Sequence, residues 1–222
     1  MLSLEVGGGR GRGRFPPPLV VDIGAHFGSA VSLFALARGA RVLAVEMQPL
    51  VARALRASAA INGWQARLQV IEAAVVPRVA ALSKSPVRYN SSCDNSAAAA
   101  VRADARTATR TSSLGNSIAP SVLLDEPLIA IDSPIIYLRI SARSAEGFAL
   151  ASMSGTIASP RRQPRMIGIE LHVRQARELV ERLHKHGYGC APFAKHRWGG
   201  FNWTGAEWDE YLRSQARGAF EL

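Results

Sequence analysis

The sequence contains few cysteines. Cys93 and Cys190 are the two it has, and they lie far apart, so neither belongs to a Cys-x-x-Cys pair. Isolated thiols of this kind argue against a metal centre or redox chemistry. We therefore expect two reduced thiols, no bound metal and a cytoplasmic location.

Long hydrophobic runs are also missing. The most apolar region, residues 19–40, is interrupted by Asp22, His26 and Arg38, whereas a membrane span requires roughly 20 continuous apolar residues. Residues 1–18 lack the apolar segment of a signal peptide. They hold Gly-Arg repeats followed by three prolines, which is typical of a flexible basic leader with a stiff end. We expect no membrane span.

The chain has fewer acidic residues than basic ones. The chain has 27 Lys and Arg residues against 17 Asp and Glu, which gives a net charge of +10. Such a charge favours anionic surfaces or substrates at low salt. It is a weak argument for nucleic acid, because abundant arginine and alanine are also typical of GC-rich genomes. A role of the Gly/Arg leader in RNA binding, as in an RNA methyltransferase, stays an alternative.

The most informative pattern lies near the start of the chain. An apolar run over 20–23 contains Asp22 and leads into a turn with Gly24 and Gly28, and a second apolar run ends at Glu46. This spacing predicts the first β-α-β unit of a nucleotide-type cofactor fold. The glycines let the backbone approach a ligand, and Glu46 can accept both hydroxyls of a ribose.

The details of the turn select among cofactors. The middle glycine of the dinucleotide motif Gly-x-Gly-x-x-Gly is absent, and Asp22 precedes the turn. A carboxylate there would repel a pyrophosphate and suits an ammonium group, such as that of S-adenosylmethionine. A nicotinamide-dependent reductase is therefore disfavoured. An ordinary α/β core in which Asp22 caps a turn stays open.

The rest of the chain predicts a single α/β domain over 19–222, with a doubly wound, mostly parallel Rossmann-like sheet and helices on both faces. Residues 83–121 are rich in Ser, Ala, Thr and Arg and predict a loop-rich insertion with one or two short strands. The strands are expected at 19–23, 41–45, 68–75, 134–140 and 165–171, and the helices at 29–38, 49–61, 145–154 and 174–186.

Four segments resemble FkbM-type S-adenosylmethionine-dependent methyltransferases: Val-Val-Asp-Ile-Gly-Ala-His-Phe-Gly (20–28), Val-Glu-Met-Gln-Pro (45–49), Ile-Asn-Gly (61–63) and Glu-Ala-Ala-Val (72–75). The similarity runs, with gaps, from about residue 19 to about 190. It implies a class I methyltransferase fold, S-adenosylmethionine as cofactor, and O-methylation of a hydroxyl on a sugar or other small metabolite. The cofactor-binding residues that it implies are Asp22, Gly24, Gly28, Glu46 and Glu72.

The fourth predicted strand departs from that family. Where the family has Lys-Ile-Asp-x-Glu-Gly-x-Glu, this chain has Ser141, Arg143 and Ser144 in place of the aspartate, the first glutamate and the glycine. Serine is no base near neutral pH without activation, and Arg143 reverses a charge. Either the substrate differs or catalysis is impaired, so a binding protein with this fold is an alternative. At the last glutamate of the family's run, this chain also has an acid, Glu146, which would equally suit a helix N-terminus.

Candidate catalytic residues lie at the end of the fifth predicted strand. Glu170 and His172 are two residues apart, so in a strand both point to one face. An acid and an imidazole could serve as proton acceptor and orienting partner for a hydroxyl substrate. The resemblance places Glu170 on a recurring acid of the family. We therefore predict Glu170, His172 and Glu146 as catalytic, although a strand end with two solvated polar residues stays open.

Overall fold

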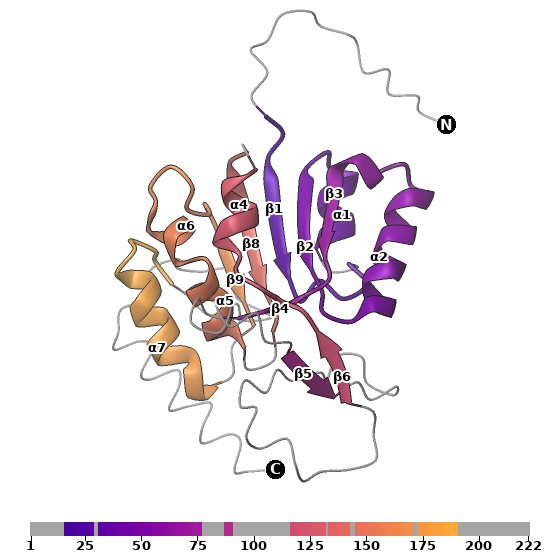
Figure 1. Ribbon diagram of the computed structural model, residues 1–222. Coiled ribbons are helices and arrows are strands. Elements are labelled where there is room, and N and C mark those ends of the chain that lie inside the picture. The colour runs from indigo at the N-terminus through magenta and orange to yellow at the C-terminus, as the bar shows by residue number, and fades with distance from the viewer. Residues whose placement is uncertain are drawn as a thin grey trace, which may run out of the picture.

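A central parallel sheet organises the molecule (Figure 1). The computed structural model describes residues 16–28, 31–76, 87–90, 116–131, 133–142, 145–170 and 173–190. Within them, five strands form the sheet in the order β3-β2-β1-β8-β9, and every neighbouring pair is parallel. The strands are β1 (Leu19–Ile23), β2 (Arg41–Val45), β3 (Leu68–Ile71), β8 (Ile135–Ile140) and β9 (Ile167–Ile169).

Helices cover both faces of this sheet, as Figure 1 shows. Side chains of α1 (Ser32–Ala37) and α2 (Pro49–Ile61) pack against Val20, Val42 and Ala44 on one face. On the other face, Val21, Leu43 and Leu138 share a core with α4 (Asp125–Ile129), α5 (Glu146–Ser152), α6 (Ser154–Ala158) and α7 (Val173–His184). The predicted doubly wound, Rossmann-like α/β architecture is confirmed.

The first two strands and α2 have the predicted bounds. All five residues of β1 are buried, which fits an apolar run that does not alternate. Pro49 occupies the first turn of α2, where its missing N–H costs nothing. The helix ends before Asn62 and Gly63, and Gly63 has a φ of +70°, a conformation that favours glycine.

The prediction of one continuous strand over 68–75 is wrong. β3 ends at Ile71, and β4 (Ala74–Val75) leaves the main sheet to pair in parallel with β7 (Ser121–Val122). The N–H of Ala74 donates to the carbonyl of Pro120 at 2.8 Å. The partner of β4 therefore comes from 47 residues further along the chain (Ala74 pairs with Ser121), which a local apolar run does not reveal.

The predicted helix over 145–154 corresponds to α5, which ends at Ser152, and a second helix, α6, begins at Ser154. The buried carboxylate of Asp125 accepts the N–H of Gly155 and of Thr156, at 2.9 and 2.8 Å. It thereby satisfies donors at the start of α6 that have no partner within that helix. A side chain some 30 residues upstream thus starts a new helix.

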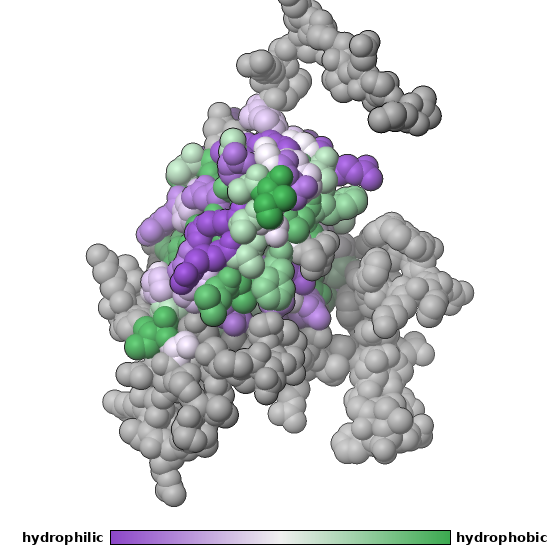
Figure 2. All heavy atoms as spheres, turned by 90° about the vertical axis from the view of Figure 1, so that its right-hand side faces the viewer, coloured by the Kyte–Doolittle hydropathy of each residue, from purple (hydrophilic) through white to green (hydrophobic). Residues whose placement is uncertain are grey.

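Two further strands, β5 (Val87–Asn90) and β6 (Asn116–Ala119), form an antiparallel pair near the ends of the predicted insertion. A short 3-10 helix, η1 (Gln65–Arg67), precedes β3. Figure 2 faces the side of the molecule that carries α2, where hydrophobic residues are interspersed with hydrophilic ones. In the part of the chain that the structure describes, no helix is both long and apolar enough to cross a bilayer.

Candidate functional site

The turn after β1 lies against the ends of the two neighbouring strands. The N–H groups of Gly24 and Ala25 both donate to the carbonyl of Val45 at the end of β2, at 2.9 and 3.1 Å. Gly24 has a φ of +73°. A Cβ there would lie 2.0 Å from the carbonyl oxygen of Ser141, just after β8. Glycine is therefore required at this position both by the backbone conformation and by the close approach of the next chain segment.

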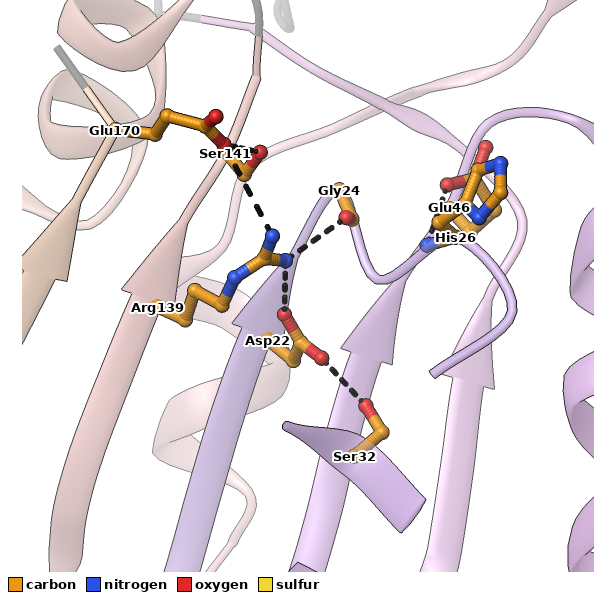
Figure 3. A network of polar contacts seen from close by, with 8 residues as sticks. All are labelled: Asp22, Gly24, His26, Ser32, Glu46, Arg139, Ser141 and Glu170. Atoms are coloured by element: carbon orange, nitrogen blue, oxygen red, sulfur yellow. Dashed lines mark hydrogen bonds and ion pairs between the residues drawn. The ribbon is translucent and has the colours of Figure 1, made fainter. Parts of the chain in front are cut away.

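Glu46 follows β2 and is held by the turn. One of its carboxylate oxygens accepts the N–H of His26 at 3.0 Å (Figure 3). The other accepts the N–H of Gln48 at 2.9 Å. His26 has a φ of +53°, which is uncommon for a residue other than glycine. A carboxylate has about four acceptor positions, so each oxygen retains capacity for a further donor. The side chain is thus fixed in place while still able to accept hydroxyl groups.

Asp22, by contrast, is engaged by the protein on both oxygens and has no exposed surface. Its Oδ2 accepts the hydroxyl of Ser32 in α1 at 2.6 Å, and its Oδ1 lies 3.0 Å from the guanidinium of Arg139 in β8. The same guanidinium nitrogen donates to the carbonyl of Gly24 at 3.2 Å. Asp22 therefore joins α1, β8 and the glycine turn. The predicted contact between Asp22 and a ligand's ammonium group stays a prediction.

The contacts continue from Arg139 to the edge of the sheet. The hydroxyl of Ser141 donates to the carboxylate of Glu170, and the second terminal nitrogen of Arg139 lies 4.0 Å from the same carboxylate oxygen (Figure 3). Glu170 directly follows β9, and its side chain is 77% exposed. The structure thus brings Glu170 into one polar network with Asp22 and Gly24. His172, Arg143 and Ser144 lie outside the described residues.

Two other predicted site residues differ from Glu170 in their surroundings. Glu146 begins α5, the helix that follows β8, and is only 1% exposed, so its catalytic role stays a prediction. Glu72 forms an ion pair with Arg56 of α2, and Arg56 also donates to the carbonyl of Val70 at 3.0 Å. This pair fixes the segment after β3 against α2. It leaves the role of Glu72 toward a cofactor as a prediction.

Sequence reasoning missed Arg139 and Ser32 as members of the site. Arg139 lies beside Asp22 in the register of β8 with β1, and Tyr137 lies beside Val20 on the same face. Burial raises the pKa of Tyr137 above 10, with the charge of Asp22 adding to this and that of Arg139 opposing it. The one local signal was that Arg139 lies two positions before Ser141, because alternation along a strand places residues two positions apart on the same face.

The described residues give this edge a charge opposite in sign to that of the chain as a whole, which carries +10. Among them, Asp22, Glu46 and Glu170 contribute three carboxylates to the ends of β1, β2 and β9, and Arg139 contributes one guanidinium. In the same described part of the chain, no three His, Cys, Asp or Glu side chains gather as metal ligands.

The sequence matches no family model and no curated protein. Among solved structures, YjhP from E. coli is 21% identical over 26% of this chain, with a TM-score of 0.24, and the match spans only 24% of YjhP. A structure described as human methyltransferase 10 domain containing protein is 15% identical, covers 86% of this chain and 72% of its own, and has a TM-score of 0.43. At these values the similarities support no argument about the function of this chain.

Proposed function

We propose that this chain is an S-adenosylmethionine-dependent methyltransferase that acts on a hydroxyl group of a sugar or other small metabolite. The observation that carries the proposal is the carboxylate of Glu46, which two backbone N–H groups hold at the end of β2 beside the glycine turn. Its remaining acceptor capacity matches the two hydroxyls of a ribose. The cofactor when bound would supply an activated methyl group.

The charge of the edge supports this cofactor over a dinucleotide. S-adenosylmethionine carries a sulfonium and an ammonium group against one carboxylate, so it is a net cation. Three carboxylates against one guanidinium would attract it. The pyrophosphate of a nicotinamide dinucleotide would be repelled, and the turn lacks the middle glycine that makes room for that group.

Replacing Glu46 by glutamine is expected to weaken the binding of S-adenosylhomocysteine by about tenfold or more, because charge-assisted hydrogen bonds to the ribose would be lost. Isothermal titration calorimetry measures the affinity. Glu181→Gln is the matched control, since Glu181 is an exposed acid of α7 that pairs with Arg177. Unchanged affinity in a Glu46→Gln protein with a normal melting temperature would remove the basis of the proposal.

Methyl transfer to an alcohol also needs an acceptor for the hydroxyl proton. We assign this role to Glu170, which is exposed at the same edge, with Ser141 donating a hydrogen bond that orients its carboxylate. His172 is proposed as the imidazole partner that the spacing suggests. Arg139 positions the group by linking Glu170 to Asp22 and the glycine turn.

Glu170→Gln is expected to lower kcat for a hydroxyl acceptor by about 10²-fold, the contribution typical of a general base. The affinity for S-adenosylhomocysteine should stay within about threefold, because Glu170 is not among the residues assigned to cofactor binding. Transfer of a radiolabelled methyl group, set against calorimetry on the same protein, separates the two quantities. A loss of affinity as large as the loss of rate would contradict the assigned role.

One observation favours a second candidate function. The residue that bonds to Glu170 is Ser141, whereas the resembling family has an aspartate at that position. A serine in place of this aspartate is expected in a protein that binds the cofactor but does not transfer its methyl group. Binding of S-adenosylhomocysteine without turnover on any hydroxyl acceptor would identify that alternative.

A further inference from the structure

A second charged feature lies at the opposite end of the sheet from the proposed cofactor site. A pocket of about 440 Å³ opens between three segments: the start of β8, the loop at 160–165 between α6 and β9, and the turn at 187–189 after α7. In Figure 1 these segments meet at the end where the strands of the main sheet begin. The volume lies in the range of roughly 300–1,000 Å³ that is typical of small-molecule sites.

The lining of this pocket is basic. Arg161 and Arg165 contribute to it, and none of the lining residues that the structure describes is an aspartate or a glutamate. Both arginines are exposed, and neither forms an ion pair with any residue that the structure describes. Arg162 lies between them in sequence and is exposed too, but it does not line the pocket. Two arginines that have no ion-pair partner among the described residues thus line one cavity.

The walls of the pocket are held in place by the backbone. The carbonyl of Ser159 accepts the N–H of Arg162 and of Gln163, at 3.0 and 2.7 Å, and the N–H of Arg165 donates to Ile135 at 3.0 Å. The hydroxyl of Tyr188 donates to the carbonyl of Pro164 at 2.7 Å. A pocket that is formed before binding avoids much of the entropy cost of ordering a loop around a ligand.

Tyr188, which also lines the pocket, adds no negative charge. Burial raises the pKa of Tyr188 to about 12, so its phenol stays protonated and keeps its hydrogen bond to Pro164 at neutral pH. At the end of α7, backbone N–H groups of Gly187 and Tyr188 bond to the carbonyls of His184 and Leu183. These bonds hold the turn at 187–188 against the end of α7.

We propose that this pocket binds the phosphate group of a small phosphorylated metabolite. Arginine presents a planar fork of donors that matches phosphate oxygens in pairs, and two such forks at one cavity can neutralise a dianion. The pocket has room for the organic part of the ligand beside its phosphate. The site is separate from the glycine turn and does not depend on the function proposed above.

The test is calorimetric titration of the full chain with ribose 5-phosphate, and separately with inorganic phosphate and with ribose. Ribose 5-phosphate is expected to bind, inorganic phosphate to bind more weakly, and ribose not to bind. Arg161→Gln and Arg165→Gln should each weaken the affinity for ribose 5-phosphate by about tenfold, the usual loss for a charged hydrogen bond. Arg162→Gln removes the same charge from the same loop and should change the affinity by less than about twofold.

Melting temperatures of the variants close to that of the unchanged chain would show that the loop still folds. Equal losses in Arg162→Gln and Arg161→Gln would overturn the proposal, since a diffuse positive field would then explain binding. Absence of binding by the unchanged chain at millimolar ribose 5-phosphate would overturn it as well. Inorganic phosphate binding as tightly as ribose 5-phosphate would contradict the assignment to a phosphorylated metabolite.

Discussion

Replacing Gly24 by alanine is expected to lower the free energy of unfolding by about 3 kcal/mol or more. A side chain at a φ of +73° costs about 1–2 kcal/mol by itself. The added Cβ would also lie 2.0 Å from the carbonyl oxygen of Ser141. Because this neighbour is backbone, relief requires β1 and β8 to separate at their carboxyl ends, which adds a cost typical of overpacking, about 1–3 kcal/mol. Urea denaturation measures the change.

Gly63→Ala is the matched control. Gly63 also has a positive φ, +70°, but nothing lies within 4 Å of the Cβ that alanine would add. Its substitution isolates the conformational penalty, about 1 kcal/mol. If Gly24→Ala costs no more than Gly63→Ala, the close approach of the turn to Ser141 is not a real constraint on this fold.

Asp22→Asn is expected to cost about 3 kcal/mol of stability. The substitution keeps the shape of the side chain, but it leaves the guanidinium of Arg139 without its closest carboxylate. Removing one partner of a buried ion pair typically costs about 3–5 kcal/mol. The lower end applies here, because Arg139 retains the carbonyl of Gly24 and the nearby carboxylate of Glu170. Urea denaturation is again the measurement.

Two further variants interpret that result. Glu181→Gln removes a carboxylate from the exposed pair with Arg177 and should cost less than about 0.5 kcal/mol. Asp22→Asn combined with Arg139→Met removes both charges, and the double variant should be less destabilised than the sum of the two single variants. Strict additivity would show that the two side chains do not interact in the folded protein.

Much of the fold could be predicted because its signals are local. The apolar runs of β1 and β2 and the position of Pro49 predicted the bounds of three elements to the residue. Where the structure differs from the prediction, the physical cause is a partner distant in sequence. β4 pairs with β7, and the carboxylate of Asp125 binds the start of α6, just after the helix that was predicted. Neither contact can be predicted from the local sequence pattern.

The same distinction applies to the candidate site. The spacing of Gly24 and Glu46 predicted that β2 would end beside the glycine turn, and the turn does bond to Val45 and Glu46 there. The role of Arg139 depends on the register of β8 against β1, which joins residues 117 positions apart. Charge complementarity to Asp22 became visible only once that register was known.

The central claim is that the edge around Glu46 binds S-adenosylmethionine, and calorimetric titration of the unchanged protein tests it most directly. S-adenosylhomocysteine and NADH are compared under the same conditions, so no knowledge of the methyl acceptor is needed. The account predicts saturable binding of S-adenosylhomocysteine at one site per chain and no binding of NADH. Saturable binding of NADH without binding of S-adenosylhomocysteine would contradict it.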